Sequence, residues 1–438
     1  SLPNRYPQGA KLPLFSAFLG GWVQPADVFV QFYASEDYSF WLDGEFSASD
    51  RYSILGAGLP VPQGEAIELA LARYVDDANL DLPFRWRPGL VGFLSYEGVP
   101  HFIHADRAVV FDHEAQGLYF IGHFDSADAF DFWHHAALLR LGLSGGQVAT
   151  YLHDAKPEVL APSRLRHSAD EYLAKIKRAQ HHIAAGDIYQ LCLTNQISIE
   201  TQAEPLAIFL SLRDANPAPY SAFVRFGSQA LVSSSPEQFL QVHADGQVST
   251  KPIKGTRPRG LDEISDAQIA NELRSDSKER AENLMIVDLM RNDIGKVAEV
   301  GSVEVSKLFD VESYTTVHQL VSTVSGRLAD GESAWSAVQA AFPGGSMTGA
   351  PKIRAMELIQ EFENGPRGAY SGCVGYLAGD GSAEFAMVIR SILFEAGTAC
   401  IGVGGGITID SDPVAELEET KLKAKALLAA LNAADPWA

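Results

Sequence analysis

The stretch F-P-G-G-S-M-T-G-A-P-K-I-R-A-M at residues 342–356 joins a glycine-rich loop to the start of a helix. Glycine and proline mark the loop, and we predict that the helix runs over 350–363. Hydroxyl groups and free backbone amides at the start of a helix are typical of a site for a carboxylate. The same residues can also serve as an ordinary helix cap. The stretch therefore predicts a loop-to-helix turn, with anion binding as one of two open interpretations.

Strands and helices alternate on both sides of this turn. A Ser-x-x-Glu capping box at 168–171 predicts the start of a helix that ends at Gly186. The other predicted helices cover 281–291, 333–342 and a segment from about 412, and the predicted strands cover 222–226, 230–233, 373–377, 385–394 and 399–407. This order is mixed α/β, and it lacks the regular βαβ period of a barrel or a dinucleotide-binding fold.

The first part of the chain has a different composition. Up to about residue 150 it consists of short segments separated by turns, and we predict strands over 28–33 and 90–96 from their β-branched and aromatic residues. A polar stretch with two prolines, 155–163, is predicted to be a connection. We therefore divide the sequence into an N-terminal portion, 1–155, and a second domain, 163–433, which holds the chemically suggestive motifs.

Composition and charge restrict the class of protein. Of the 438 residues, 46% are hydrophobic and 20% are charged, which is typical of a soluble globular protein. No segment approaches the roughly 18 apolar residues of a membrane span, and the first residues have no apolar run like that of a secretory signal. The 3 cysteines are too few for a disulfide framework or a cysteine-ligated zinc site. We therefore expect a cytoplasmic protein that does not bind membranes.

Acidic residues outnumber basic ones by 55 to 34, so the formal net charge is −21. This balance argues against a nucleic-acid-binding protein, which needs a basic surface. It also implies that an anionic substrate needs a local cationic site or a metal ion.

Lys254 lies in a basic segment, K-P-I-K-G-T-R-P-R at 251–259. Positive charges nearby, and any burial, disfavour the charged form of a lysine and lower its pKa. A neutral amine near pH 7 is a nucleophile. An isolated lysine of this kind is more often a solvated residue in a basic turn, so the interpretation depends on the other motifs.

Two pairs of glutamates have helical spacing. Glu279 and Glu282 are three residues apart, as are Glu416 and Glu419, so each pair lies on one face of a helix. Two facing pairs would form an oxygen-rich site suited to Mg²⁺. Such pairs are also common on solvated helices. The second pair follows a glycine-rich turn at 402–407, where backbone amides can approach an anion closely.

Four long motifs occur in order: P-I-K-G-T (252–256), A-E-N-L-M-I-V-D-L-M-R-N-D (281–293), the stretch 342–356, and G-G-G-I (404–407) followed by E-x-x-E-T-K (416–421). With them the chain resembles the chorismate-utilising enzymes, which include anthranilate, aminodeoxychorismate, isochorismate and salicylate synthases. The resemblance covers roughly residues 165–433 and is loose over 1–150. It implies a large composite α/β (α+β) fold, in which antiparallel-rich sheets form a sandwich with helices outside.

Two positions indicate which reaction the resemblance implies. Lys254 stands where anthranilate synthases have alanine and aminodeoxychorismate synthase component I has lysine. Gln190 stands where isochorismate and salicylate synthases have a lysine that activates water, and an amide cannot accept that proton. The resemblance thus implies that chorismate and ammonia become 4-amino-4-deoxychorismate, a precursor of p-aminobenzoate and folate. Anthranilate synthase component I and a catalytically silent chorismate-binding subunit are the alternatives.

The resemblance also implies a role for each matched residue. Lys254 would attack ring carbon 2 and form a covalent intermediate, Glu237 would protonate the departing 4-hydroxyl, and His318 would lie near that hydroxyl. Mg²⁺ would bind Glu282 and Glu419, with Glu279 and Glu416 close by. The implied substrate contacts are Gln190, Thr256, Ser346, Tyr370, Arg390, Lys423 and the backbone amides of Gly404, Gly405 and Gly406.

Two features of the family are missing or altered. Some relatives bind tryptophan in the N-terminal portion through an L-L-E-S-like motif, and the nearest match, Trp41-Leu42-Asp43-Gly44, lacks the glutamate and the serine. Tryptophan binding is therefore in doubt. The sequence shows no glutaminase segment, so we expect ammonia from solution or from a glutamine amidotransferase subunit in a heterodimer. We also expect a separate lyase to release p-aminobenzoate.

Overall fold

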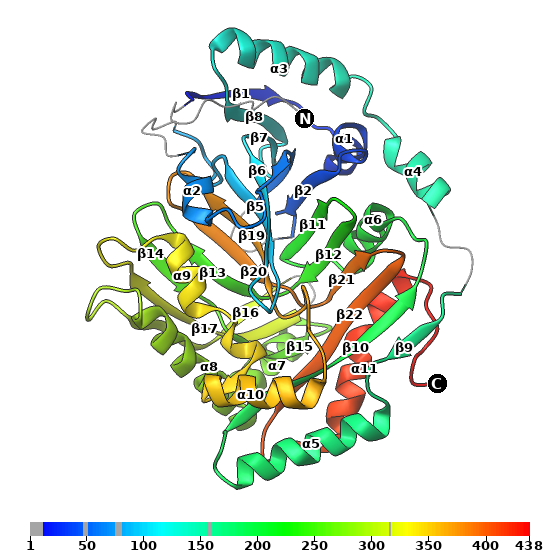
Figure 1. Cartoon of the computed structure of the whole chain (residues 1–438), viewed down its shortest axis with the longest axis vertical. Coiled ribbons are helices and arrows are strands. Elements are labelled where there is room, and N and C mark those ends of the chain that lie inside the picture. Colours follow the sequence, from blue (N-terminus) through cyan, green and yellow to red (C-terminus); the bar gives the residue numbers. More distant parts are fainter. Residues whose placement is uncertain (1–11, 47–50, 75–80, 156–159, 315–316) are drawn as a thin grey trace.

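The computed structural model describes residues 12–46, 51–74, 81–155, 160–314 and 317–438 (Figure 1). Two large sheets face each other, and every strand pair among these residues is antiparallel. Helices lie on the outside of the sheets, so the expected sandwich of antiparallel-rich sheets is confirmed.

The first sheet has 12 strands and runs from the N-terminal part of the chain to the glycine-rich loop. Its order is β1 (Leu14–Gly20), β8 (Gly117–His123), β7 (Arg107–Asp112), β3 (Tyr52–Ala57), β2 (Tyr38–Asp43), β11 (Tyr220–Phe226), β12 (Gln229–Ser235), β21 (Ser391–Glu395), β22 (Thr398–Ile407), β10 (Gln190–Glu200) and β18 (Gly349–Ala350), with β9 (Ser163–Leu165) beside β10.

The second sheet has 10 strands. Its order is β15 (Ile253–Pro258), β17 (Val317–Arg327), β14 (Gln247–Thr250), β13 (Gln238–Val242), β20 (Ala383–Met387), β19 (Cys373–Ala378), β5 (Gly89–Leu94), β6 (Pro100–Ala105) and β4 (Leu59–Pro60), with β16 (Glu304–Ser313) beside β17. Strands from before residue 125 and after residue 185 pair with each other in both sheets, at β2–β11 and at β5–β19. The predicted division of the sequence near residue 155 therefore does not correspond to separate sheets.

Alternating side chains fill the space between the sheets and the space beneath the helices. Phe40 packs inside the sandwich with Phe93, whereas the next residue, Trp41, points to the other face of β2 and packs among the helices. The helices on the outer face of the first sheet are α1 (Pro25–Tyr33), α3 (Ala127–Leu141), α4 (Gln147–Ala155), α6 (Pro205–Ala215) and α11 (Pro413–Ala430).

The remaining helices surround the catalytic motifs. Those that cover the second sheet are α2 (Ile67–Leu71), α8 (Ser277–Gly295) and α9 (Ala334–Ala341), while α7 (Glu263–Ser275) packs on β15, β16 and β17. Two more, α5 (Ala169–Ala184) and α10 (Lys352–Glu363), pack together against β10, and the short 3₁₀ turn η1 (Gly345–Met347) precedes β18.

Most of the predicted elements after residue 165 are confirmed. α5 begins at the predicted capping box, in which Ser168 accepts from the Glu171 amide and Glu171 accepts from the Ser168 amide. The predicted strand over 385–394 is instead two strands, β20 and β21, because Arg390 has a left-handed backbone with φ of 51° between them.

The prediction of a strand over 28–33 is wrong, because these residues belong to helix α1. Pro25 occupies the first turn, where its missing amide costs nothing, and Val28, Phe29 and Phe32 are buried with helical spacing. Helices α3 and α4 were not expected in the N-terminal portion either. Most of the predicted connection at 155–163 cannot be compared, because residues 156–159 lie outside the described residues. Among the described residues, no helix is long and apolar enough to cross a membrane.

Candidate active site

The glycine-rich loop that precedes α10 forms one wall of the candidate active site. Its short strand β18 extends the first sheet, with Ala350 opposite Gln190 at the start of β10. The Cys192 amide donates to the Thr348 carbonyl over 2.8 Å, which ties the loop to the same strand. The loop is therefore part of a sheet edge as well as the start of a helix.

Lys254 and Gln190 come together at Gly406. Gly406 lies on β22 opposite Cys192, and a Cβ atom added to it would lie 2.4 Å from Gln190 Nε2 and 3.5 Å from Lys254 Nζ. Gln190 is buried, and its Oε1 has no hydrogen-bond partner among the described residues. Because buried polar atoms are nearly always paired, an unpaired amide oxygen next to an amine marks a place for a polar ligand.

A bulge sets the direction of the Lys254 side chain. The register of β15 against β17 shifts between Lys254 and Thr256, and the intervening Gly255 has a φ of 77°. Lys254 Nζ then lies 3.9 Å from Glu282 Oε2, and 17% of the side chain is exposed. The neighbouring Arg257 is not directed at the lysine, because it is paired with Glu279 over 3.4 Å.

Glu237 has the environment that a general acid requires. It lies in the turn between β12 and β13 and is 9% exposed. Burial raises the pKa of its carboxyl to about 7, although a hydrogen bond from Ser346 and the charge of Lys254 act in the opposite direction. A carboxyl group with this pKa is largely protonated just below neutral pH and can donate its proton.

The charges of the two predicted glutamate pairs, on α8 and α11, act on one another. Burial is the main cause that raises the pKa of Glu282, and the charges of Glu279 and Glu416 raise it further. The contribution of Glu416 shows that carboxylates from the two helices act on one another. For Glu419, burial acts to raise the pKa, but the ion pair with Lys423 and two further lysines outweigh it, and the pKa is lowered.

Basic side chains currently balance these carboxylates. Lys254 and Lys278 each lie 3.9 Å from Glu282, and Lys423 lies 2.7 Å from Glu419. Within the described ranges, no group of three or more potential ligands is close enough to hold a metal ion as arranged. The donor set nevertheless fits Mg²⁺ in kind, because the mutually repelling carboxylates are oxygen ligands whose charge a divalent cation would neutralise. The magnesium site stays a prediction.

The remaining predicted substrate contacts surround the same strand β22. The ring of Tyr370 lies against Gly402, where an added Cβ atom would be 2.0 Å from its Cγ. Lys423 donates to the Gly404 carbonyl over 2.8 Å. The guanidinium of Arg390 has no hydrogen-bond or ion-pair partner among the residues that the structure describes, so it is free to bind a carboxylate.

His318 is near the site but already has partners. Its Nδ1 lies 2.7 Å from Ser313 Oγ and its Nε2 lies 2.8 Å from Asp266 Oδ1. Asp266 is in turn paired with Arg259. Both ring nitrogens are therefore engaged within the chain, and the expected contact with a departing hydroxyl stays a prediction. Thr256 lies on the neighbouring strand, opposite Gln319.

The sequence analysis missed two groups of residues around the site. Lys278 lies one turn before Glu282, where an i, i+4 spacing could have indicated it. The pair of Glu363 and Arg367 connects segments that border the site, and its partners are mostly backbone atoms, which have no sequence signal.

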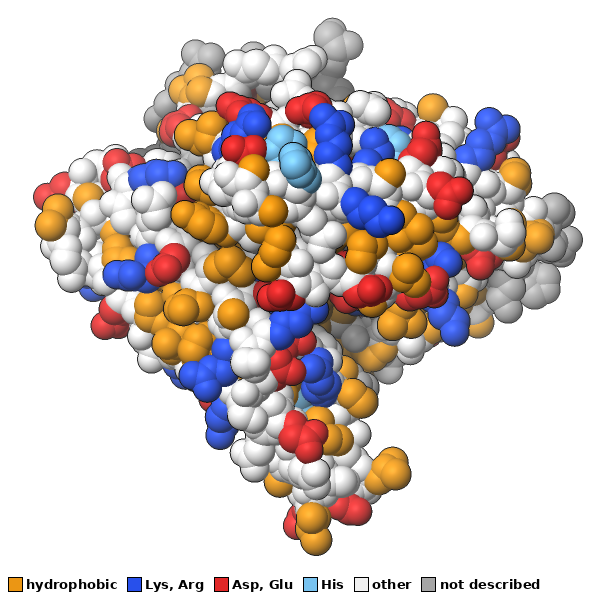
Figure 2. Space-filling model, turned by 90° about the horizontal axis from the view of Figure 1, so that it is seen from below, with side chains coloured by type: hydrophobic (Ala, Val, Ile, Leu, Met, Phe, Trp, Pro, Cys, Tyr) orange, Lys and Arg blue, Asp and Glu red, His pale blue; other side chains and the backbone are white. Residues whose placement is uncertain are grey.

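On the lower face of the molecule, acidic and basic side chains are interspersed (Figure 2), so the net charge is not concentrated in a single acidic patch there.

A separate small cavity lies between the two sheets, beside the tetrapeptide 41–44. It measures about 60 Å³, and it is lined by Asp43, Tyr52, Tyr220, Tyr376, Glu384 and neighbouring residues. Asp43 does not point freely into it, because its carboxylate accepts hydrogen bonds from Ser53 and Arg213.

Comparison with known proteins places the chain in a family. Residues 70–429 match the family model described as chorismate binding enzyme. The match begins well before residue 165, where the resemblance carried by the motifs was expected to begin. The chain is 45% identical over 373 residues to aminodeoxychorismate synthase of Streptomyces griseus, a match that covers 81% of this chain and 52% of that protein. This chain therefore spans about half the length of the first relatives it matches.

Anthranilate synthase component 1 is also similar to this chain. That protein of Streptomyces coelicolor is 36% identical over 463 residues, which cover 97% of this chain and 89% of the relative. The crystal structure of anthranilate synthase component I from Streptococcus pneumoniae superposes with a TM-score of 0.68 at 29% identity, covering 97% of this chain and 94% of the other. Because the chain is similar to enzymes of both names, the two reactions have to be distinguished by individual residues.

Proposed function

The chain belongs to the family of chorismate binding enzymes, and from this premise we propose that it is an aminodeoxychorismate synthase. The observation that carries the proposal is the position of Lys254, whose amine lies beside Gln190 at Gly406. A lysine here can occupy ring carbon 2, whereas a glutamine at position 190 cannot deprotonate a water molecule for the same carbon. Nitrogen would then enter at carbon 4.

The reaction divides into two displacements. In the first, the Lys254 amine forms a bond to ring carbon 2, both ring double bonds shift by one position toward carbon 4, and the 4-hydroxyl departs as water with a proton from Glu237. In the second, ammonia forms a bond to carbon 4, both double bonds shift back, and the lysine leaves carbon 2 with the bonding electron pair. The Glu237 carboxylate recovers its proton from the added ammonia.

The substrate is an anion in an acidic protein, and three features would hold it. Mg²⁺, bound by Glu282 and Glu419 with Glu279 and Glu416 nearby, would supply positive charge for the ring carboxylate. Arg390 is free to form a bidentate contact with a carboxylate. The backbone amides at 404–406 lie on β22 and would add hydrogen-bond donors.

Ammonia would come from solution or from a glutamine amidotransferase, and its product would supply p-aminobenzoate and folate. The nitrogen source can be tested by supplying ammonium or glutamine to the purified chain, with and without an added amidotransferase subunit. Turnover with ammonium alone, and with glutamine only when the subunit is present, is the expected result.

Product analysis tests the main proposal. The purified chain receives chorismate, Mg²⁺ and excess ammonium at neutral pH, with and without an aminodeoxychorismate lyase. We expect p-aminobenzoate only when the lyase is present. Fluorescent anthranilate that forms without the lyase would instead assign the chain to the alternative reaction, and the absence of any turnover would favour a silent chorismate-binding subunit.

A further inference from the structure

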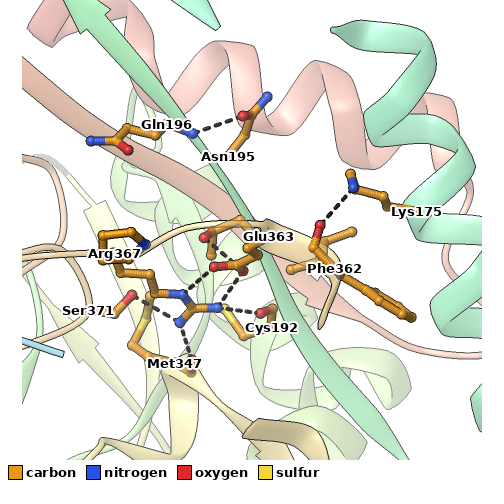
Figure 3. Close-up of polar contacts among 12 residues, drawn as sticks. Lys175, Cys192, Asn195, Gln196, Met347, Phe362, Glu363, Arg367 and Ser371 are labelled. Atoms are coloured by element: carbon orange, nitrogen blue, oxygen red, sulfur yellow. Dashed lines mark hydrogen bonds and ion pairs between the residues drawn. The ribbon is translucent and has the colours of Figure 1, made fainter. Parts of the chain in front are cut away.

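A buried ion pair between Glu363 and Arg367 connects three segments that border the candidate active site: the glycine-rich loop, the segment that holds Tyr370, and strand β10. Glu363 ends α10 and Arg367 follows in the next turn, and the side chain of each is only 2% exposed. Arg367 Nε donates to Glu363 Oε2 over 2.8 Å, and a second nitrogen donates to Oε1 over 2.7 Å. Figure 3 shows the guanidinium directed at this carboxylate and at three other acceptors around it.

All of the remaining donors of Arg367 are used. They reach the Met347 carbonyl at 2.6 Å, the Ser371 hydroxyl at 3.2 Å and the Cys192 carbonyl at 2.8 Å (Figure 3). The guanidinium also lies 4.5 Å from the ring centre of Tyr96. The charge is thus fully paired, in the planar geometry that only arginine provides.

Each acceptor is close in sequence to a proposed substrate contact. Met347 follows Ser346, Ser371 follows Tyr370, and Cys192 is two residues from Gln190 on the same face of β10. The Glu363 carboxylate adds a fourth connection, because Oε1 accepts from both the amide and the hydroxyl of Thr194 at 2.9 Å. Thr194 lies opposite Gly404.

We propose that Arg367 is a positioning residue for this reaction, which sets the places of Ser346, Tyr370 and β10 relative to one another through its pair with Glu363. The inference rests on the proposed function only in requiring that chorismate reacts at this site, whichever product forms. A contribution to stability alone would not require that every connection end beside a different substrate contact.

Loss of Arg367 would affect the chemistry by displacing Ser346. The Ser346 hydroxyl donates to the Glu237 carboxyl, and this bond lowers the pKa of Glu237 against the effect of burial. Lys254 is the charged group that acts on Glu237 in the same direction. If Arg367 no longer holds the Met347 carbonyl, Ser346 is displaced and the acid becomes weaker.

The test is Arg367→Lys, assayed as chorismate consumption with ammonium and Mg²⁺ so that the result does not depend on the identity of the product. Lysine keeps a positive charge next to Glu363 but cannot make all five directed bonds. We expect kcat to fall roughly 10- to 100-fold, with a change in KM for chorismate below about 3-fold. We also expect the alkaline limb of the kcat profile to move up by at least about 0.5 pH unit.

A double-mutant cycle with Ser346→Ala separates positioning from a loss of stability. If Arg367 acts through Ser346, Ser346→Ala alone shifts the alkaline limb in the same way, and Arg367→Lys adds little shift in the double variant. Additive effects, or an unchanged pH profile in Arg367→Lys, would overturn the proposal. These outcomes are changes in the pH dependence of chorismate consumption, so they can be distinguished from a failure to form 4-amino-4-deoxychorismate.

The matched control is Arg213→Lys on α6, where another largely buried arginine pairs with Asp43 of the N-terminal part and lies over the ring of Trp41. This control should lower the unfolding temperature without changing kcat or the pH profile of the folded enzyme. If Arg367→Lys does not fold, Ser371→Ala removes a single acceptor beside Tyr370. A loss of at least about 3-fold in kcat/KM then supports the proposal, and unchanged kinetics overturns it.

Discussion

Two buried polar regions of this molecule differ in how completely their charged and polar side chains are paired. In the N-terminal region, Asp43 accepts from Ser53 at 2.7 Å and from Arg213 at 2.7 Å, and the arginine lies over Trp41. In the candidate active site, among the described residues, Lys254 has a single ion pair at 3.9 Å, and the side-chain oxygen Oε1 of Gln190 has no partner. Paired groups stabilise a fold, whereas groups left unpaired at a cost in stability are available to a ligand.

The largest effect should come from the lysine. Lys254→Ala removes the nucleophile and only one long ion pair, so we expect aminodeoxychorismate formation to fall by about 10³-fold or more with little change in the free energy of unfolding. Lyase-coupled assays and urea unfolding measure the two quantities. Mass spectrometry should detect an adduct with chorismate in the parent protein and none in the variant. An unchanged rate would contradict the covalent role.

The next effect concerns the acid. Glu237→Gln keeps the shape of the side chain but cannot donate a proton, so we expect kcat to fall by about 10²- to 10⁴-fold. The alkaline limb near pH 7 that Glu237 causes in the parent enzyme should also disappear. A variant with near-normal turnover would refute the assignment.

Glu237→Gln should lower the rate but raise the stability of the folded protein above neutral pH. Because burial raises the pKa of Glu237 from 4.5 to about 7, the folded protein binds this proton more tightly than the unfolded chain does. That stabilisation is complete below about pH 4.5 and is lost as the pH rises to 7. At pH 8 we expect Glu237→Gln to be more stable than the parent by about 3 kcal/mol, and the difference should vanish at acidic pH in urea titrations.

The close approach of β22 gives a smaller effect. Gly406→Ala would place a Cβ atom 2.4 Å from Gln190 Nε2 and 3.5 Å from Lys254 Nζ, so the amide of Gln190 must move beside the lysine. A displacement of this size should lower kcat/KM about 10- to 100-fold. As a control, Gly295→Ala at the end of α8 meets no atom within 4 Å and should leave the kinetics unchanged. Equal kinetics for the two variants would exclude a role for this contact.

The sequence predicted the elements whose signals are local. The capping box of α5 and the loop before α10 could be read directly, because the residues that form them are adjacent in the chain. The five apolar residues and Gln31 at 28–33 gave a wrong prediction, since such a short run fits a strand or a buried helix equally well, whereas Pro25 favours the first turn of a helix. Chain-distant pairing, as between β2 and β11, has no local signal at all.

The candidate site shows the same limit. The motifs predicted which side chains belong to it, but the meeting of Lys254 and Gln190 at Gly406 depends on two strand registers and a bulge. Arg367 was missed because two of its acceptors are backbone carbonyls of residues far away in the chain, and its own surroundings, G-P-R-G, have the composition of an ordinary turn.

The smallest effect on the rate should come from the N-terminal pair, where the comparison began. Asp43→Asn removes one of the two carboxylates that pair with Arg213, while Glu45 keeps the other pair, so we expect the free energy of unfolding to fall by about 2 kcal/mol. The rate per folded molecule should change less than about 2-fold, because no connection from Asp43 ends at Lys254 or Glu237. Thermal unfolding and the coupled assay provide both values. If Asp43→Asn instead lowered kcat at unchanged stability, the two regions would be coupled across the sandwich, and the distinction between stabilising and reactive charges would fail.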